Sequence, residues 1–414
     1  MSGLASYFDS LETREPEARE RALFARLPEQ IALAKTDSPA YRDTLSHFDP
    51  GDVASRTALA RLPVLRKSEL LERQRAAPPF ANLPTVPRER FVRVFSSPGP
   101  MYAPQIDRPD FARLARAMHA AGFKRGQLVH VAFTYHFAPG AWMMDSAARA
   151  LGCPVFPGGV GQSELQARTI AELKPHAYAG TPSFLKILLE TGQQLGLDLS
   201  SLKVALVSGE AFPPSLHAAV KALGVDAYQC YATADLGLIA YESPAREGLV
   251  LDEDIIVEIV RPGTGDPVPD GEVGEIVVTN FAAEYPLIRF ATGDLSAILA
   301  GASPCGRTNR RIKGWMGRAD QTAKVKGMFV HPRQVADVLS RHKEVRRGRL
   351  VVAQANGADM MTLRCETDAP TAALKDAIRE SIQAVCKVRG EVEFVALGNL
   401  PNDGKVIDDV RTYD

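Results

Sequence analysis

A glycine next to a carboxylate marks the first stretch of this sequence that could do chemistry. Leu287, Ile288 and Phe290 form an apolar, strand-like run, and Thr292-Gly293-Asp294 follows directly. A carboxylate at the end of a strand can accept both hydrogen bonds of a ribose diol, as acidic residues do in other nucleotide-binding folds. The pattern therefore predicts that Asp294 binds a nucleotide sugar. Since T-G-D is also a common turn, a plain turn is the alternative at this spacing.

The elements that must position such a side chain alternate regularly from Leu128 onward. Two helix-like segments begin at prolines, in Thr181-Pro182 and in Pro213-Pro214. Short apolar runs between the helix-like segments predict strands; they are Leu128–Phe133, Pro154–Phe156, Ala177–Ala179, Val204–Val207 and Ala227–Cys230. Alternation of this kind predicts a largely parallel sheet that is covered on both faces, with ligands at the carboxyl ends of the strands.

The later part of the chain changes pattern twice. Residues 251–281 alternate and turn as antiparallel strands do. Beyond Asp320 three strand-like runs and one helix with an apolar face predict a compact α+β unit. We therefore predict an α/β protein with two domains. Residues 1–319 form a large domain with mostly parallel sheets and a β-rich subdomain, and residues 320–414 form a small α+β domain.

The composition narrows the classes of partner. Lys plus Arg and Asp plus Glu number 49 each in 414 residues, so no bulk charge attracts nucleic acid or a membrane surface. No apolar stretch is long enough to span a bilayer, and the N-terminus shows no signal peptide. The five cysteines are scattered without C-x-x-C pairs, which is typical of free thiols in a reducing cytoplasm. We expect a cytoplasmic protein with no nucleic-acid or membrane partner.

Several motifs, in this order, resemble those of the acyl-adenylate-forming ligases. They are P-D-G-E-V-G-E-I-V-V-T, Y-P-L-I-R-F-A-T-G-D-L, G-R-A-D and a final L-P-x-x-x-G-K that ends at Lys405. The superfamily includes acyl-CoA synthetases, peptide-synthetase adenylation domains and luciferases. The short length and the neighbouring sequence look most like the phenylacetate-CoA ligase branch, and the resemblance runs from about residue 60 to the end.

The resemblance places a phosphate loop at R-V-F-S-S-P-G-P-M-Y-A-P. Loops of this kind work because successive backbone N–H groups converge on anionic oxygens. Here Pro98 and Pro100 have no N–H, and the loop contains no lysine. Ser96, Ser97 and Gly99 are the expected phosphate contacts. A rigid, proline-rich turn that has lost phosphate binding is the alternative.

The family motif Y-G-x-[ST]-E corresponds to Tyr231-Ala232-Thr233-Ala234-Asp235. The resemblance implies that Tyr231 packs on adenine, with Ala232 beside it, and that Asp235 helps to hold Mg²⁺. Carboxylate oxygens suit that hard cation. Ala234 stands where the family has a hydroxyl, so Thr233 is expected to replace that group.

Two further loops follow predicted strands. Ser208-Gly209-Glu210-Ala211 matches the family loop that lies against adenine, where Gly209 lets the base approach the backbone. Tyr135-His136-Phe137 matches the aromatic segment that lines the acyl pocket, and a purely structural aromatic cluster is the alternative.

The resemblance also implies the charged groups of catalysis. Lys405 is the lysine that reaches the carboxylate and the α-phosphate during adenylation. Arg289 and Arg318 are cations near the phosphates. The small domain is expected to rotate about Asp320, which presents the Lys326-Gly327 loop to the pantetheine arm of coenzyme A.

These expectations describe an acid–CoA ligase. It would use ATP and Mg²⁺ to convert an aryl carboxylic acid to an acyl-adenylate, release pyrophosphate, and transfer the acyl group to coenzyme A with loss of AMP. Two alternatives stay open: an adenylating enzyme with a carrier-protein or amine acceptor, and a non-catalytic protein that binds the nucleotide or the acyl-adenylate. Assembly as a homodimer is also left open.

Overall fold

The structure is a computed structural model that describes residues 7–97, 101–319, 323–325, 328–355, 358–401, 403 and 405–411. The chain forms two compact units, each described here by itself. The first comprises Met1–Val257, Val278–Phe290 and Leu299–Trp315, and the second comprises Glu258–Val277, Ala291–Ile298 and Met316–Asp414. The domain boundary predicted at 319/320 stays a prediction, since Asp320 lies outside the described residues.

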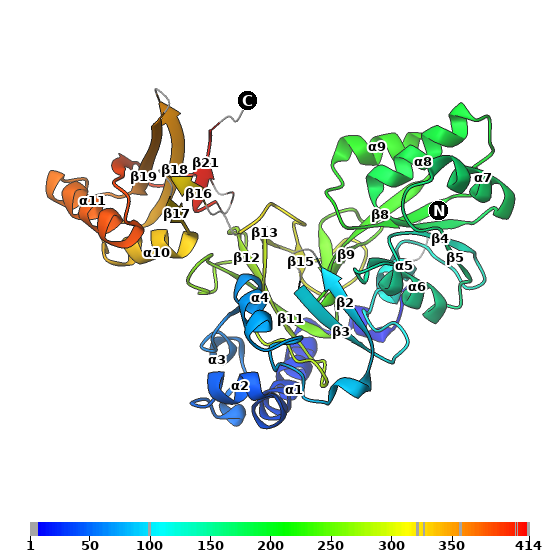
Figure 1. The fold of residues 1–414 in the computed structure, drawn as a ribbon, viewed down its shortest axis with the longest axis horizontal. Helices are drawn as coiled ribbons and strands as arrows, with labels where there is room; N and C mark the ends of the chain where they lie inside the picture. The colour runs from blue at the N-terminus through cyan, green and yellow to red at the C-terminus, as the bar shows by residue number, and fades with distance from the viewer. Residues whose placement is uncertain are drawn as a thin grey trace. The chain divides into compact units, whose positions relative to one another are not determined.

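The main sheet has nine strands in the order β14-β15-β10-β9-β8-β7-β6-β4-β5. Figure 1 labels β4, β5, β8, β9 and β15 among them. Five neighbouring strands are parallel: β4 (Val129–Ala132), β5 (Val155–Pro157), β6 (Ala177–Gly180), β7 (Val204–Val207) and β8 (Asp226–Thr233). The sheet becomes antiparallel at β9 (Gly237–Glu242), β10 (Leu249–Leu251) and β15 (Arg311–Ile312), and β14 (Ile298–Leu299) completes it. All five strands predicted from the apolar runs are confirmed.

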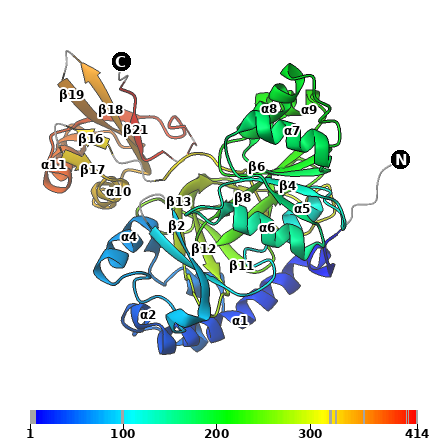
Figure 2. The ribbon, with the colours of Figure 1, turned by 45° about the vertical axis from the view of Figure 1, so that its right-hand side comes forward.

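Two sets of helices cover this sheet (Figure 2). One face carries α7 (Ser163–Leu173), α8 (Pro182–Gln194) and α9 (Pro214–Ala222), and the other carries α5 (Ala115–Ala120) and α6 (Gly140–Ala150). The pleat sorts the core between them: in β7, Ala205 and Val207 pack with the first set and Leu206 with the second. Both predicted proline starts are confirmed, because Pro182 and Pro214 are the first residues of their helices.

A second sheet has the order β1-β13-β12-β11. Its strands are β1 (Leu65–Arg66), β11 (Ile255–Val260), β12 (Gly274–Asn280) and β13 (Phe290–Ser296). The last three strands run from one compact unit into the other. They correspond to the β-rich passage expected before the predicted boundary.

Residues ahead of the main sheet form one long helix, several short helices and a hairpin. The helices are η1 (Ser10–Thr13), α1 (Pro16–Asp37), α2 (Pro39–Thr44), η2 (Pro50–Asp52), α3 (Arg56–Leu59), α4 (Lys67–Ala76) and η3 (Arg88–Arg90). The hairpin pairs β2 (Phe91–Ser97) with β3 (Met101–Ile106). It is tied to α4 through buried Gln74, whose amide donates to the Tyr102 carbonyl oxygen at 2.7 Å and accepts from the Tyr102 N–H at 2.8 Å.

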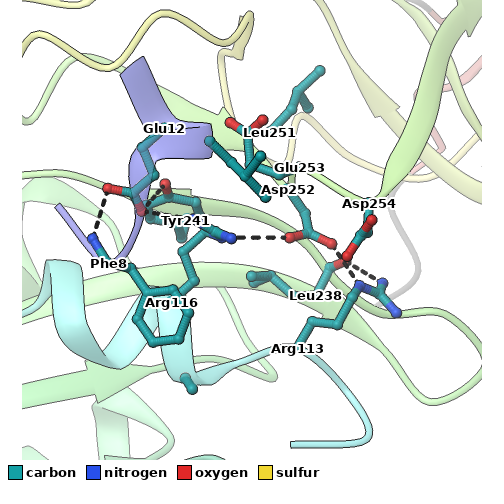
Figure 3. A network of polar contacts seen from close by, with 12 residues as sticks. Phe8, Glu12, Arg113, Arg116, Leu238, Tyr241, Leu251, Asp252, Glu253 and Asp254 are labelled. Carbon is teal, nitrogen blue, oxygen red and sulfur yellow. Dashed lines mark hydrogen bonds and ion pairs between the residues drawn. The ribbon is translucent and has the colours of Figure 1, made fainter. Parts of the chain in front are cut away.

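A buried ion network attaches the start of the chain to the main sheet (Figure 3). The Glu12 carboxylate is fully buried and accepts from Arg116 at 3.2 Å and from the Tyr241 hydroxyl at 3.0 Å. Its other oxygen lies 3.0 Å from an Nη of Arg307. These partners come from α5, β9 and the loop before β15, so one carboxylate joins three segments that are remote in sequence.

The second unit contains the small α+β fold predicted for the end of the chain. Its sheet has the order β20-β19-β18-β21 and carries α10 and α11. The elements are β16 (Ala323–Val325), β17 (Met328–Val330), α10 (Pro332–Ser340), β18 (Arg347–Ala355), β19 (Ala358–Glu366), α11 (Ala372–Cys386), β20 (Glu391–Val395) and β21 (Ile407–Asp409). The predicted α/β class with a small α+β part is thereby confirmed. Among the described residues, no helix combines the length and the apolar character needed to cross a bilayer.

The Glu12 network yields a test of stability. Glu12→Gln keeps the size of the side chain but removes the anion beside Arg307 and one of the anions beside Arg116, which also pairs with Asp9. Breaking a buried pair costs about 3–5 kcal/mol. We expect the free energy of unfolding from urea titration to fall by that amount. Glu17→Gln, on the exposed side of α1, is the matched control and should change it by less than about 0.5 kcal/mol. Equal effects of the two substitutions would show that the network does not stabilise the fold.

Candidate active site

Asp294 lies within β13. Its neighbours are the Thr292 hydroxyl and the Arg318 guanidinium group. The Thr292 hydroxyl donates to the Ile276 carbonyl oxygen at 3.1 Å and accepts from the Asp294 N–H at 3.2 Å. An Asp294 carboxylate oxygen accepts from Arg318 at 3.2 Å, and the two residues also form an antiparallel bridge. The structure thus brings together two residues that were predicted to bind the nucleotide.

Gly293 makes this approach possible. It has φ +76°, and a Cβ there would lie 2.7 Å from an Nη of Arg318. A side chain at this position would displace the end of Arg318 from the carboxylate, and the positive φ within β13 itself favours glycine.

Asp235 lies in the turn between β8 and β9, at the point where the sheet changes from parallel to antiparallel. The Thr233 hydroxyl accepts from the Leu236 N–H at 3.2 Å and shapes this turn. Gly237 closes it with φ +72°, and a Cβ there would lie 2.6 Å from the Ala112 carbonyl oxygen. The predicted replacement of a phosphate-binding hydroxyl by Thr233 stays a prediction.

The Asp235 carboxylate is nearly inaccessible, with 1% of its side chain exposed. One oxygen accepts from the Lys67 ammonium at 2.9 Å. The other oxygen, Oδ1, is buried with no hydrogen-bond partner in the described part of the chain. An anionic oxygen in that state is costly unless a cation or a donor reaches it.

This unsatisfied oxygen fits the Mg²⁺ that was predicted here. The described residues contain no cluster of three or more His, Cys, Asp or Glu side chains that could hold a metal by themselves. Mg²⁺ in nucleotide sites uses one or two carboxylates together with water and substrate phosphates, so a single carboxylate is compatible with it. Asp235 would hold such an ion, which would neutralise phosphate charge when bound.

The loop after β7 carries the predicted adenine contacts. The Ser208 hydroxyl donates to the Cys230 carbonyl oxygen at 2.9 Å, next to Tyr231 on the neighbouring strand. Gly209 has φ +86°, and a Cβ there would lie 3.2 Å from the Phe133 ring. The Glu210 carboxylate accepts from the Ser183 N–H at 2.7 Å in the first turn of α8. Glu210 therefore caps a helix, a function that the sequence did not indicate.

Three further residues were predicted to contact the nucleotide, and these contacts stay predictions. Tyr231 and Ala232 lie at the end of β8, where the pairing with β9 is irregular, and Ala211 is exposed in the loop after β7. The ends of β7 and β8 meet because the two strands are parallel neighbours.

The β2–β3 hairpin ends at the predicted phosphate loop. Ser96 pairs with Tyr102 and Ser97 with Met101, and the Ser97 hydroxyl donates to the Met101 carbonyl oxygen at 3.3 Å. The Ser96 N–H donates to the Phe137 carbonyl oxygen at 2.9 Å. The hairpin and the aromatic segment are therefore joined directly. Gly99 lies outside the described residues.

The aromatic segment is only partly enclosed. The Tyr135 hydroxyl lies 3.4 Å from an Asp145 carboxylate oxygen, and burial raises the pKa of this phenol, with the Asp145 charge adding to the rise. Tyr135 therefore stays a hydrogen-bond donor at neutral pH. The His136 N–H donates to Thr134, and its side chain is exposed. Phe137, with φ +59°, is 83% exposed.

A cavity of about 130 Å³ lies beside Asp235. Its lining includes Phe95, Phe111, Met143 and Tyr285, and it does not include the Tyr135–Phe137 segment. These residues come from separate elements, and no local sequence pattern connects them. Sequence reasoning therefore missed this cavity, whose lining also includes charged residues such as Arg113, Asp254 and Glu284.

Arg289 requires a correction. It was predicted to be a catalytic cation near the phosphates, but its side chain is buried in the scaffold. One Nη donates to the carbonyl oxygens of Ala60 at 2.8 Å and Leu62 at 2.6 Å. The guanidinium thus holds the segment that leads into β1 and α4. The physical reason is local: Arg289 comes directly before β13 with a left-handed backbone (φ +46°), and its side chain lies against the backbone of residues 60–62.

Lys405 lies two residues before β21 in the second unit. Its N–H donates to the Asp403 carboxylate at 3.1 Å, and its ammonium donates to Asp408 at 2.8 Å. The side chain is 48% exposed, so the ammonium can exchange the Asp408 partner for another anion. Asp320, Lys326 and Gly327, predicted for the hinge and for coenzyme A binding, lie outside the described residues.

Two family profiles match this chain. The AMP-binding enzyme family profile matches residues 110–282, and the profile of the AMP-binding enzyme C-terminal domain matches residues 327–410. A phenylacetate-coenzyme A ligase of Aromatoleum evansii is 31% identical over 359 residues, which cover 82% of this chain and 80% of that protein. A phenylacetate-coenzyme A ligase of Thermus thermophilus is 31% identical over 382 residues, or 88% and 85% of the two chains.

Among solved structures, a 2-hydroxyisobutyryl-CoA ligase in complex with 2-HIB-AMP and CoA superimposes with a TM-score of 0.71 at 27% identity. The match covers 97% of this chain and 92% of that chain. The fold, the profile matches and the identity over more than four-fifths of the sequence agree with one another. The chain belongs to the AMP-binding enzyme family, in the branch of the phenylacetate-coenzyme A ligases.

Proposed function

We propose that this protein is an AMP-forming acid–thiol ligase, which activates an aryl carboxylic acid with ATP and transfers the acyl group to coenzyme A. The observation that carries the proposal is the similarity to phenylacetate-coenzyme A ligases over more than four-fifths of the chain. The motif resemblance in the sequence supports Asp294, Asp235 and Lys405 as the functional residues of this protein. The related 2-hydroxyisobutyryl-CoA ligase has been captured with its own acyl-adenylate and CoA.

The chemistry needs charge management more than covalent catalysis. A carboxylate is a poor acyl donor because its leaving group would be oxide. Attack of the carboxylate oxygen on the α-phosphorus of ATP forms a P–O bond, breaks the α–β bridge and releases pyrophosphate. The resulting mixed anhydride has AMP as its leaving group. Positioned cations and hydrogen-bond donors stabilise the charge that develops at the phosphorus.

Each described residue has a part in this scheme. Asp294 accepts the hydroxyls of the ribose, and Arg318 keeps that carboxylate ordered. Tyr231 and the Ser208–Ala211 loop border the adenine, and Lys405 neutralises charge on the α-phosphate and the substrate carboxylate. Mg²⁺, held by Asp235, supplies additional positive charge to the phosphates when bound.

The second half-reaction transfers the acyl group from phosphate to sulfur. The coenzyme A thiolate attacks the acyl carbon, the anhydride C–O bond breaks, and AMP leaves with the electron pair. We propose that the small domain rotates about Asp320 between the two half-reactions, which withdraws Lys405 and presents the Lys326-Gly327 loop. Hinges of this kind absorb large backbone changes at a few residues.

The acid is proposed to be aromatic. The relatives are named for phenylacetate, and aromatic or polarisable side chains, Phe95, Phe111 and Met143, line the cavity beside Asp235. Tyr135, His136 and Phe137 are the proposed rim of the acyl site. A carrier-protein or amine acceptor and a homodimer are the finer alternatives for the partners. The proposed compartment is the reducing cytoplasm, where the five free thiols persist.

The deciding experiment is exchange of labelled pyrophosphate into ATP with a panel of aryl, alkyl and amino acids. We expect exchange that depends on an aryl acid and, when coenzyme A is added, a thioester detected by mass spectrometry. Exchange without a thioester would assign another acceptor. Binding of AMP without any exchange would assign the protein to the non-catalytic alternative.

Lys405 should act in one half-reaction only. Lys405→Ala removes an ammonium that contacts the developing charge, and loss of one such contact slows a reaction by about 100- to 1,000-fold. We expect that loss in acyl-adenylate formation, with unchanged attack of coenzyme A on a supplied acyl-adenylate. Lys343→Ala, an exposed lysine of the same unit, is the control. Equal losses in both halves would contradict the assignment.

Asp294 should bind the ribose whatever the number of phosphates. An unpaired buried hydroxyl costs about 1–3 kcal/mol, so Asp294→Ala should weaken ATP and AMP binding together by about 10- to 100-fold. Calorimetry with 2′-deoxy-AMP sharpens the test, because the variant should no longer distinguish it from AMP. Asp266→Ala, at an exposed position of the same unit, is the control. An unchanged AMP affinity would remove Asp294 from the nucleotide site.

A further inference from the structure

The phosphate hairpin carries no lysine of its own, yet a lysine from another element lies beside it. Lys67 is the first residue of α4, and its ammonium donates to Asp235 Oδ2 at 2.9 Å. The sequence at this point resembles the L-P-x-x-x-K passage that precedes the phosphate loop of phenylacetate-CoA ligases, and by itself it indicated only a turn and a capped helix. The structure places a cation on the carboxylate that was predicted to lie at the phosphates.

Two supports hold Lys67 in that position. Buried Gln74, two turns further along α4, forms a pair of hydrogen bonds with Tyr102 at 2.7 and 2.8 Å. Tyr102 pairs directly with Ser96, so Gln74 connects α4 to β2 and β3, the two strands on either side of the predicted phosphate loop. At the other end, Arg289 holds the carbonyl oxygens of residues 60 and 62, just before the chain enters β1 and α4.

The geometry points to Lys67 as the cation that binds the pyrophosphate part of ATP in this protein, a further inference that rests on the proposed function. An ammonium has three N–H donors, and Asp235 uses one of them. The Lys67 side chain is 29% exposed, whereas the Asp235 side chain is 1% exposed. The pair is therefore open on the lysine side, where an anion can reach the remaining donors.

The charge balance supports the same assignment. The prolines predicted to weaken the loop remove N–H donors at positions 98 and 100. Arg289, one of the cations first expected at the phosphates, is committed to backbone carbonyls. Lys67 supplies positive charge from the same unit as the hairpin, and it lies 2.9 Å from the carboxylate proposed to hold Mg²⁺.

The alternative is a structural ion pair in which Lys67 only neutralises Asp235. A charge-assisted hydrogen bond to phosphate is worth roughly 1.5–3 kcal/mol, which corresponds to about 10- to 100-fold in affinity. Lys67→Met should therefore weaken ATP binding by that factor and leave AMP binding unchanged, because AMP lacks the β- and γ-phosphates. A purely structural lysine would change both affinities equally or neither.

The experiment is calorimetric titration of the full-length chain with ATP and with AMP, both in excess Mg²⁺ and without acid substrate. Lys186→Met is the matched control, since Lys186 is 37% exposed and pairs with Glu190 on α8, as Lys67 pairs with Asp235. Each substitution is also made in an Asp235→Asn background, where no carboxylate charge is left to neutralise. We expect Lys67→Met to cost the same additional 10- to 100-fold in ATP affinity there.

Each outcome decides between the two roles. Loss of ATP affinity alone, in both backgrounds, supports a direct phosphate contact. No further loss in the Asp235→Asn background, or equal loss of ATP and AMP, overturns it and leaves a structural pair. Failure of the wild-type chain to bind either nucleotide would instead refute the proposed function.

Discussion

The ion pair between Lys67 and Asp235 is the interaction on which the arrangement of the candidate nucleotide site depends. It joins the first residue of α4 to the turn between β8 and β9, 168 positions further along the chain. A carboxylate buried this deeply is stable only when a cation or several donors balance its charge. The pair therefore aligns the phosphate hairpin, which α4 carries through Gln74, with the carboxyl end of the main sheet.

The second constraint is the change of strand direction at β8. Strands β4 to β8 run parallel, so their carboxyl ends and the loops that follow share one edge. β9 then returns antiparallel, and the tight turn between the two strands buries Asp235 instead of releasing the chain into a helix. A cavity lies beside this carboxylate, and its lining combines aromatic side chains such as Phe95 and Phe111 with charged ones such as Arg113.

Charged side chains thus serve two purposes in this fold. Glu12 and Arg289 are buried within the scaffold, and each joins segments that are distant in sequence. Lys67, Arg318 and Lys405 pair with carboxylates but keep part of each side chain accessible. The exposed fraction of the side chain distinguishes the two groups. A cation can bind a phosphate only if some of its N–H donors are not already used inside the protein.

Local sequence determined the elements and most of the chemistry of the predicted site. Apolar runs located β4 to β8, prolines located the starts of α8 and α9, and the motif order located Asp294, Asp235 and Lys405. These features are encoded within a few neighbouring residues, because they depend on side-chain periodicity, proline geometry and turn residues.

Only the tertiary structure decided which charges serve the scaffold and which can serve the nucleotide. Arg289 and Lys67 are both cations beside a short strand, and nothing in their flanking residues distinguishes them. Arg289, just before β13, lies on the carbonyl oxygens of residues 60 and 62, whereas Lys67, at the first position of α4, lies on Asp235. The partners lie between 168 and 229 positions away, so the direction of each side chain depends on contacts that no local pattern contains.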